Sequence, residues 1–188
     1  MEHTHTLVIG GGQAGIAMSA HLQKHGIAHV VLERARIAER WRTERWDSLV
    51  ANGPAWHDRF PEADFDDVAP DAFPPKDRVA AYFQTFAETR ALPVRTGVTV
   101  TRLWRDVDGY RASTSGGEIA AQTVVVATGP FQRPLIPTVV TDPAITQLHS
   151  SAYRNPDALP KGAVLVVGAG SSGAQIAEEL ARAGRRVF

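Results

Sequence analysis

A glycine-rich turn between a strand and a helix constrains this chain more than any other feature of its sequence. An apolar run at residues 6–9 is followed by GGGQAG (residues 10–15) and then by a helical pattern that ends at Gly26. A second apolar run, Ile27–Leu32, ends at Glu33. This order of strand, turn, helix and strand predicts a βαβ unit with parallel strands.

Each glycine of the turn has its own physical reason. Gly10 permits the tight exit from the strand, Gly12 lets the backbone approach a pyrophosphate, and Gly15 allows close packing of helix on strand. The unpaired N–H groups and the positive dipole end at the start of the helix attract phosphate. Glu33 ends the second strand, where a carboxylate can accept hydrogen bonds from a ribose. The pattern predicts dinucleotide binding, and the alternative is a glycine turn without a ligand.

The same pattern occurs a second time near the end of the chain. Leu7–Val30 aligns without a gap to Leu165–Phe188, and the turn glycines coincide because Gly168, Gly170 and Gly173 match those of the first turn. We therefore expect a second dinucleotide unit. The chain stops inside its predicted second strand, so we expect the front part of a longer protein, with a first domain at 1–160 and the truncated start of a second at 161–188.

The remaining patterns complete a prediction of the α/β class. Residues 34–75 are predicted to form long loops over a site, and residues 130–160 a proline-rich linker. The other predicted helices cover 77–89 and 174–183, and the predicted strands cover 94–104, 110–113, 118–121, 123–127 and 163–167. Together they indicate a Rossmann-like fold with a parallel sheet, a β-meander and an incomplete second unit.

Composition narrows the class of protein. The chain has 20 Lys and Arg against 20 Asp and Glu, so no global field favours nucleic acid or a membrane surface as partner. It has no cysteine, which excludes disulfides, thiolate zinc sites and a cysteine nucleophile among these residues and is typical of a reducing compartment. No signal peptide or membrane span is visible, so we expect a cytoplasmic protein.

These motifs carry a family resemblance. GGGQAG, then ER at 33–34, ATG at 127–129 and GAGSSG at 168–173 resemble the two-dinucleotide flavoproteins. Within them, WDSLVANGPAWHDRFPEADF (46–65) and FPPKDRVAAYFQTFAE (73–88) are similar to the post-flavin segment of flavin-containing monooxygenases, which act on amines, sulfides and indole-3-pyruvate.

The resemblance implies an enzyme with two cofactors, FAD and NAD(P)H, with NADPH favoured. The nicotinamide reduces FAD, the reduced flavin captures O2 as a C4a-peroxide, and a small nucleophilic substrate takes the oxygen. A homodimer is compatible with this resemblance, which does not by itself fix the oligomeric state. Two alternatives are a flavin-dependent reductase or dehydrogenase without oxygenation, and a non-catalytic FAD-binding fragment.

Carried over by position, the resemblance assigns roles to individual residues. The FAD ligands would be Gly10, Gly12, Gln13, Ala14 and Gly15 at the pyrophosphate, Glu33 at the adenosine ribose, Val98 at the adenine, Arg40 and Trp41 where the family lines the flavin, and Arg34, Thr128 and Gly129 elsewhere along the cofactor. The NAD(P)H ligands would be Gly168, Gly170, Ser171, Ser172 and Gly173. Two family glycines before the tryptophan are Ala38 and Glu39 here, a departure that bears on the shape of this loop.

Asn52 is the one candidate catalytic side chain. It matches a family asparagine near the flavin, where an amide donor could stabilise the oxygen adduct. The alternative is a turn residue, because Asn-Gly favours turns and Gly53-Pro54 follow.

The family has a fingerprint of four residues in the linker, and this chain keeps half of it. His149 and Tyr153 match, whereas Pro143 and Ile145 replace a phenylalanine and a glycine. The alternative is that the matching pair simply caps the linker.

Other clusters have simpler interpretations. His21 and His25 share a helix face but lack a third metal ligand, and the acidic residues at 62–67 lack the spacing of a calcium loop, so we expect solvated surface and no metal. An aromatic set could shape a pocket or belong to the core; its members are Trp41, Trp46, Trp56 and Phe60.

Overall fold

The computed structural model describes residues 1–188, which form two compact units. Unit 1 comprises Met1–Thr43 with Val50–Gln132, and unit 2 comprises Glu44–Leu49 with Arg133–Phe188. Residues 133–160 thus group with the second glycine turn rather than with the first. The boundary expected at residue 160, between an FAD-binding and an NAD(P)-binding domain, stays a prediction.

Unit 1 is built on one six-stranded sheet with the order β3-β2-β1-β6-β5-β4. Its strands are β1 (Glu2–Ile9), β2 (His29–Leu32), β3 (Val94–Arg95), β4 (Val100–Asp106), β5 (Gly109–Thr114) and β6 (Gly117–Val126). Strands β3, β2, β1 and β6 run parallel, whereas β6, β5 and β4 form an antiparallel meander. The predicted α/β class with a parallel sheet and a β-meander is confirmed.

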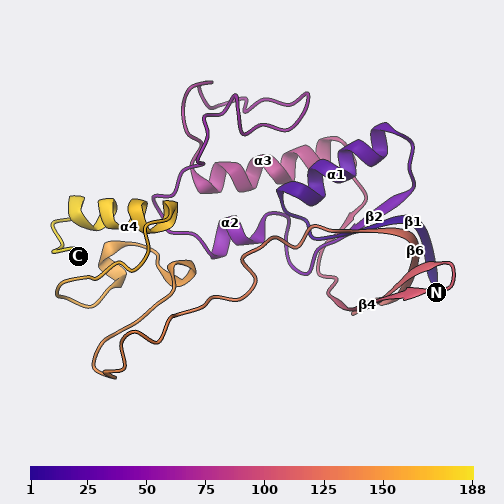
Figure 1. The fold of residues 1–188 in the computed structure, drawn as a ribbon. Helices are drawn as coiled ribbons and strands as arrows, with labels where there is room; N and C mark the ends of the chain where they lie inside the picture. The colour runs from indigo at the N-terminus through magenta and orange to yellow at the C-terminus, as the bar shows by residue number, and fades with distance from the viewer. The chain divides into compact units, whose positions relative to one another are not determined.

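Two hydrophobic clusters hold unit 1 together. Helices α1 (Gln13–Lys24) and α3 (Lys76–Thr89) lie alongside each other on one side of the sheet (Figure 1). They pack with the loop between them around buried aromatic residues, which are Phe60, Phe65, Tyr82, Phe83 and Phe86. The second cluster joins parallel strands to the meander and contains Leu7, Val30, Leu32, Ala112, Ile119 and Ala121. This cluster therefore ties β1 and β2 to β5 and β6.

Three of the strand predictions in unit 1 were wrong in their extent. The run 94–104 is broken after Arg95, because Gly97 takes a positive φ of 73° and the amides of Gly97 and Val98 bond to the loop after β2. Conversely, the runs 118–121 and 123–127 form the single strand β6, whose two halves pair with different neighbours. The apolar run at the end of β6 is not buried throughout, since Val126 is 64% exposed.

The long segment after β2 is ordered by backbone pairing rather than by regular structure. It contains the short helix α2 (Glu39–Thr43), and then the amides of Ala51 and Ala55 donate to the carbonyls of Pro74 and Ala72 over 2.8 and 2.9 Å. These bonds close residues 51–72 into a loop. No helix of the chain is both long enough and apolar enough to cross a bilayer.

Unit 2 contains two 3₁₀ turns, η1 (Ser150–Ala152) and η2 (Pro156–Ala158), and the helix α4 (Ser171–Arg182). The strand predicted at 163–167 is reduced to one parallel bridge between Val164 and Val187. A two-stranded pair without further strands cannot bury its apolar side chains, and Val167 is accordingly exposed. The predicted helix begins three residues earlier, at Ser171, directly after the glycine turn.

Candidate cofactor site

The first glycine turn packs too tightly for side chains at two positions. Gly10 has a φ of 114°, and a Cβ there would lie 2.4 Å from the carbonyl oxygen of Ala127. A Cβ on Gly15 would lie 1.8 Å from the carbonyl oxygen of Gly10. These contacts bring β1, the start of α1 and the exit of β6 together, as the spacing of the glycines predicts.

Gly12 is different, because no atom lies within 4 Å of the place where its Cβ would be. It is the N-cap of α1 with an extended backbone, and no side chain caps the helix and no acidic residue occupies its first turn. The amides of Gln13 and Ala14 open the helix beside this space. Open room next to an uncapped helix N-terminus is what a pyrophosphate requires, so the residues fit the phosphates of a dinucleotide.

Glu33 faces the turn rather than bulk solvent. Its Oε2 accepts a hydrogen bond from the Gly11 N–H at 2.7 Å, and its Oε1 accepts one from the Ala35 N–H at 2.9 Å. A Cβ on Gly11 would lie 2.9 Å from the Cβ of Glu33, so this glycine allows the carboxylate to reach the turn. The neighbouring Arg34 is exposed. The carboxylate is thus held where a ribose beside the pyrophosphate could meet it.

The loop after Glu33 keeps a glycine-type conformation without glycine. Ala38 is buried with a φ of 57°, and its amide donates to the Gly11 carbonyl at 3.1 Å. Helix α2 follows directly and carries both Arg40 and Trp41. Trp41 is half-buried, with its ring edge-on to Phe83 at 6.4 Å. Alanine in place of the family glycine at position 38 therefore leaves the loop bonded to the glycine turn. The role of Arg40 and Trp41 in lining the flavin stays a prediction.

The other proposed FAD contacts lie at the carboxyl ends of neighbouring strands. Val98 donates its amide to the Glu33 carbonyl at 3.0 Å, which leaves its carbonyl as the group that could meet an adenine. Thr128 and Gly129 are exposed just beyond β6, and Gly129 has a φ of 78°. The Gln132 amide closes this exit by donating to the Thr128 carbonyl. Their contacts with a cofactor stay predictions.

Asn52 lies exposed in the bend that leaves Ala51. The next amide, that of Gly53, donates to Asp58 Oδ2 at 3.0 Å, and Asp58 Oδ1 lies 2.8 Å from His57 Nδ1. Asn52 is therefore a turn residue in this fold. Its catalytic role stays a prediction. Sequence reasoning missed Asp58, because a polar contact five positions away within a loop has no periodic signal.

Unit 2 repeats the geometry of the first turn. Gly168 has a φ of 116°, a Cβ on Gly173 would lie 2.0 Å from the Gly168 carbonyl oxygen, and nothing lies within 4 Å of a Cβ on Gly170. Gly170 is the uncapped N-cap of α4, whose first two residues are Ser171 and Ser172. The second turn therefore fits a second dinucleotide by the same physical argument as the first.

The linker residues His149 and Tyr153 behave differently from each other. His149 caps η1, because its Nδ1 accepts the Ser151 amide at 3.2 Å. Tyr153 is almost fully buried, and its hydroxyl donates to Glu179 Oε2 on α4 at 2.7 Å. Burial, reinforced by this carboxylate, raises the pKa of Tyr153 above its usual value. The capping interpretation holds for His149, whereas Tyr153 anchors the linker to helix α4 within unit 2.

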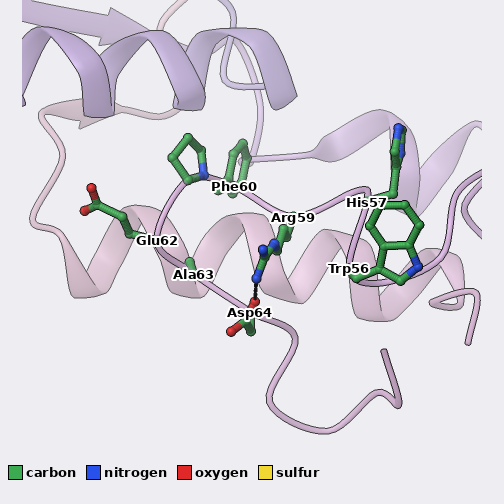
Figure 2. Close-up of a pocket in the computed structure, with 8 residues that line it drawn as sticks. Trp56, His57, Arg59, Phe60, Glu62, Ala63 and Asp64 are labelled. Carbon is green, nitrogen blue, oxygen red and sulfur yellow. Dashed lines mark hydrogen bonds and ion pairs between the residues drawn. The ribbon is translucent and has the colours of Figure 1, made fainter. Parts of the chain in front are cut away.

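The aromatic set divides between core and surface. Trp46 and Phe60 are buried, whereas Trp56 is 54% exposed. Figure 2 shows Trp56 and His57 at one end of an open cavity of about 360 Å³, with Arg59 paired to Asp64 across it. His21 and His25 are exposed on α1, and no three histidine, aspartate or glutamate side chains of the chain are arranged to hold a metal ion.

Comparison with known proteins decides the family. A family model described as pyridine nucleotide-disulphide oxidoreductase matches residues 7–188. The chain belongs to this family. An uncharacterised CzcO-like oxidoreductase of Geobacillus kaustophilus is 40% identical over 184 residues, which cover 96% of this chain and 52% of that protein. The indole-3-pyruvate monooxygenase YUCCA1 of Oryza sativa is 32% identical over 96% of this chain and 46% of its own length.

Solved structures agree with this placement in the pyridine nucleotide-disulphide oxidoreductase family. A variant of the flavin monooxygenase of Stenotrophomonas maltophilia superposes with a TM-score of 0.91 at 28% identity, over all of this chain and 57% of its own. The chain thus spans about half the length of the relatives it matches. This family member has no cysteine among its 188 residues, so no dithiol accompanies the two glycine turns here.

Proposed function

We propose that this chain forms the FAD-binding part of an NAD(P)H-dependent flavin monooxygenase that oxygenates a small nucleophilic substrate. One observation carries the proposal. The uncapped start of α1 borders open space at Gly12, and Glu33 is held beside it by the Gly11 amide. This arrangement supplies donors for a pyrophosphate and an acceptor for a ribose at the same place. Similarity to flavin monooxygenases supports the choice of FAD as the dinucleotide.

In this proposal each group of residues has a defined task. The amides of Gln13 and Ala14 hold the pyrophosphate, and the carboxylate of Glu33 accepts from the ribose hydroxyls. The second turn, at Gly170, holds NADPH in the same way. A bound flavin would supply the chemistry that takes a hydride from the nicotinamide and delivers electrons to O2. Asn52 is proposed to donate its side-chain amide to the oxygen-bearing edge of the flavin.

A titration tests the binding part of this proposal. FAD added to the purified chain is expected to lose fluorescence and to raise the melting temperature, because a ligand that binds only the native state stabilises it. A chain that neither quenches FAD nor is stabilised by it would instead be a fragment without cofactor binding.

A second candidate function is supported by the linker. Pro143 and Ile145 stand where the fingerprint of the resembled family has a phenylalanine and a glycine, so a reductase or dehydrogenase without oxygenation is the competing activity. The amount of oxygenated product formed per NADPH consumed distinguishes these two activities. A monooxygenase converts a thioether or an amine with NADPH and O2 in equal amounts, whereas a dehydrogenase needs an organic acceptor and incorporates no oxygen.

A further inference from the structure

The carboxylate of Asp58 has a different partner on each of its two oxygens. Its Oδ2 accepts the Gly53 N–H at 3.0 Å, and its Oδ1 lies 2.8 Å from Nδ1 of His57. The Asp58 side chain is 29% exposed, against 65% for His57. A half-buried carboxylate with a partner on each oxygen is held in one orientation, because the loss of either hydrogen bond would cost free energy.

The packing at Gly53 shows how closely these groups fit. A Cβ on Gly53 would lie 2.6 Å from Asp58 Oδ1 and 2.8 Å from His57 Nδ1. Gly53 has no positive φ, so its glycine is explained by this contact and not by backbone strain. The side chains of residues 57 and 58 therefore occupy the space beside the Asn52–Gly53 peptide.

The backbone around this turn is fixed on both flanks. The Ala51 amide donates to Pro74 at 2.8 Å and the Ala55 amide to Ala72 at 2.9 Å. The Pro54 carbonyl accepts from the amides of His57 and Asp58, which returns the chain toward Gly53. The Gly53 amide is directed at Asp58, so the orientation of the Asn52–Gly53 peptide depends on that carboxylate.

We infer that Asp58 is a positioning residue that sets the direction of the Asn52 side chain by holding the Gly53 N–H. This inference rests on the proposed function, in which Asn52 acts beside the flavin. Asp58 itself contacts no reacting group. The carboxylate acts through the backbone of Gly53, and the His57 ring is only the partner of its other oxygen.

The test compares Asp58→Ala, Asp58→Asn, His57→Ala and Asn52→Ala, with Asp71→Ala as the control, an exposed aspartate of the same loop. Amide hydrogen exchange is measured on the chain without cofactor. The Gly53 amide is expected to exchange about tenfold faster or more in Asp58→Ala, since a hydrogen bond to a charged group is lost. Asp58→Asn keeps an acceptor oxygen for Gly53 and is expected to restore slow exchange, and both His57→Ala and the control are expected to retain it.

A second measurement uses the FAD-loaded protein and records hydrogen peroxide released per NADPH consumed. Asp58→Ala and Asn52→Ala are expected to raise this ratio to the same extent, and Asp58→Asn is expected to return it to the parent value. If His57→Ala and Asp58→Asn both resemble Asp58→Ala, the effect runs through the imidazole and the inference is overturned. It is also overturned if Gly53 exchange is unchanged in Asp58→Ala.

The two proposals fail in distinguishable ways. If Asn52→Ala releases more peroxide and Asp58→Ala does not, the positioning role is lost while the role of Asn52 stands. If Asp58→Ala speeds the exchange at Gly53 and neither variant changes the peroxide ratio, the turn is positioned as inferred but Asn52 has no part in the chemistry, so the functional half of the inference falls.

Discussion

The backbone N–H of Gly11 donates to Glu33 Oε2 over 2.7 Å, so the acid that ends β2 is bonded to the turn that follows β1. This bond fixes the carboxylate beside the space at Gly12. Because a second oxygen accepts from Ala35, the free chain already holds the geometry that a ribose would use.

Replacing Glu33 is therefore expected to affect both folding and binding. Glu33→Ala removes the acceptor of two amides, which should lower the free energy of unfolding by about 1–2 kcal/mol, and should weaken FAD binding more than about tenfold. Glu33→Gln keeps an acceptor for one amide and should recover stability more than affinity. Denaturant unfolding and FAD fluorescence titration measure the two effects. Unchanged affinity in Glu33→Ala would contradict the ribose role.

Gly12 and Gly15 are expected to separate binding from folding. A methyl on Gly12 meets no atom within 4 Å, so Gly12→Ala should cost less than about 1 kcal/mol, as expected for alanine in place of glycine at an N-cap. It should nevertheless block FAD, because the methyl enters the pyrophosphate space. Gly15→Ala, whose methyl would lie 1.8 Å from the Gly10 carbonyl oxygen, should disrupt the fold.

The repeated turn provides the matched control for this prediction. Gly170→Ala makes the same change at the equivalent position of unit 2, where again no atom lies within 4 Å. It should leave FAD affinity unchanged and weaken NADPH binding. Equal loss of FAD binding in Gly12→Ala and Gly170→Ala would show that the two turns do not have separate ligands. Thermal melts check that both variants fold.

The glycine turns could be predicted from sequence because each glycine there answers a local steric demand that only glycine meets. The turn at 10–15 and its repeat at 168–173 appear in the structure with the predicted geometry. The parallel pairing of β1 with β2 follows from the same βαβ pattern. These features need only short-range information, which a single sequence contains.

Features that depend on distant partners could not be predicted. Ala38 takes a left-handed conformation that its residue type disfavours, because its amide bonds to Gly11, which is remote in sequence. The run 94–104 has strand character apart from Gly97, yet the bonds from the amides of Gly97 and Val98 to the distant loop after β2 separate β3 from β4. Asp58 is one acid among several in an acidic loop, and nothing in its neighbours distinguishes it before the loop closes on Gly53.

The end of α3 offers a stabilising substitution. Ala91 follows the C-cap with a φ of 48°, its amide donates to Glu88, and the Leu92 amide donates to Ala87. This is the Schellman arrangement, in which glycine is preferred because a Cβ is strained at positive φ. Ala91→Gly should raise the free energy of unfolding by about 0.5–1 kcal/mol.

Helix α1 supplies the reverse experiment. It ends in the same arrangement with Gly26 at a φ of 67°, and a Cβ there would meet no atom within 4 Å. Gly26→Ala should therefore destabilise the chain by a similar amount through backbone strain alone. Denaturant unfolding of both variants measures the pair. A loss of stability in Ala91→Gly would mean that the entropy of the unfolded chain outweighs the strain.

Two buried tyrosines predict a loss of stability at alkaline pH. Burial raises the pKa of Tyr82, whose hydroxyl accepts the Phe60 amide and donates to Ala63, and burial together with Glu179 raises the pKa of Tyr153. A folded pKa above the unfolded value means that this contribution is complete below the ordinary tyrosine pKa of about 10 and is lost as pH rises through the folded value.

Tyr153→Phe isolates one of these contributions. At neutral pH it should cost about 1–2 kcal/mol, because the buried hydroxyl no longer donates to Glu179. Between about pH 9 and pH 11 its melting temperature should fall less steeply than that of the parent, since one group that resists ionisation in the folded state is gone. Tyr110→Phe, in β5, is the matched control among the three tyrosines. Parallel melting curves for the parent and Tyr153→Phe would show that this hydroxyl ionises alike in the folded and unfolded chain.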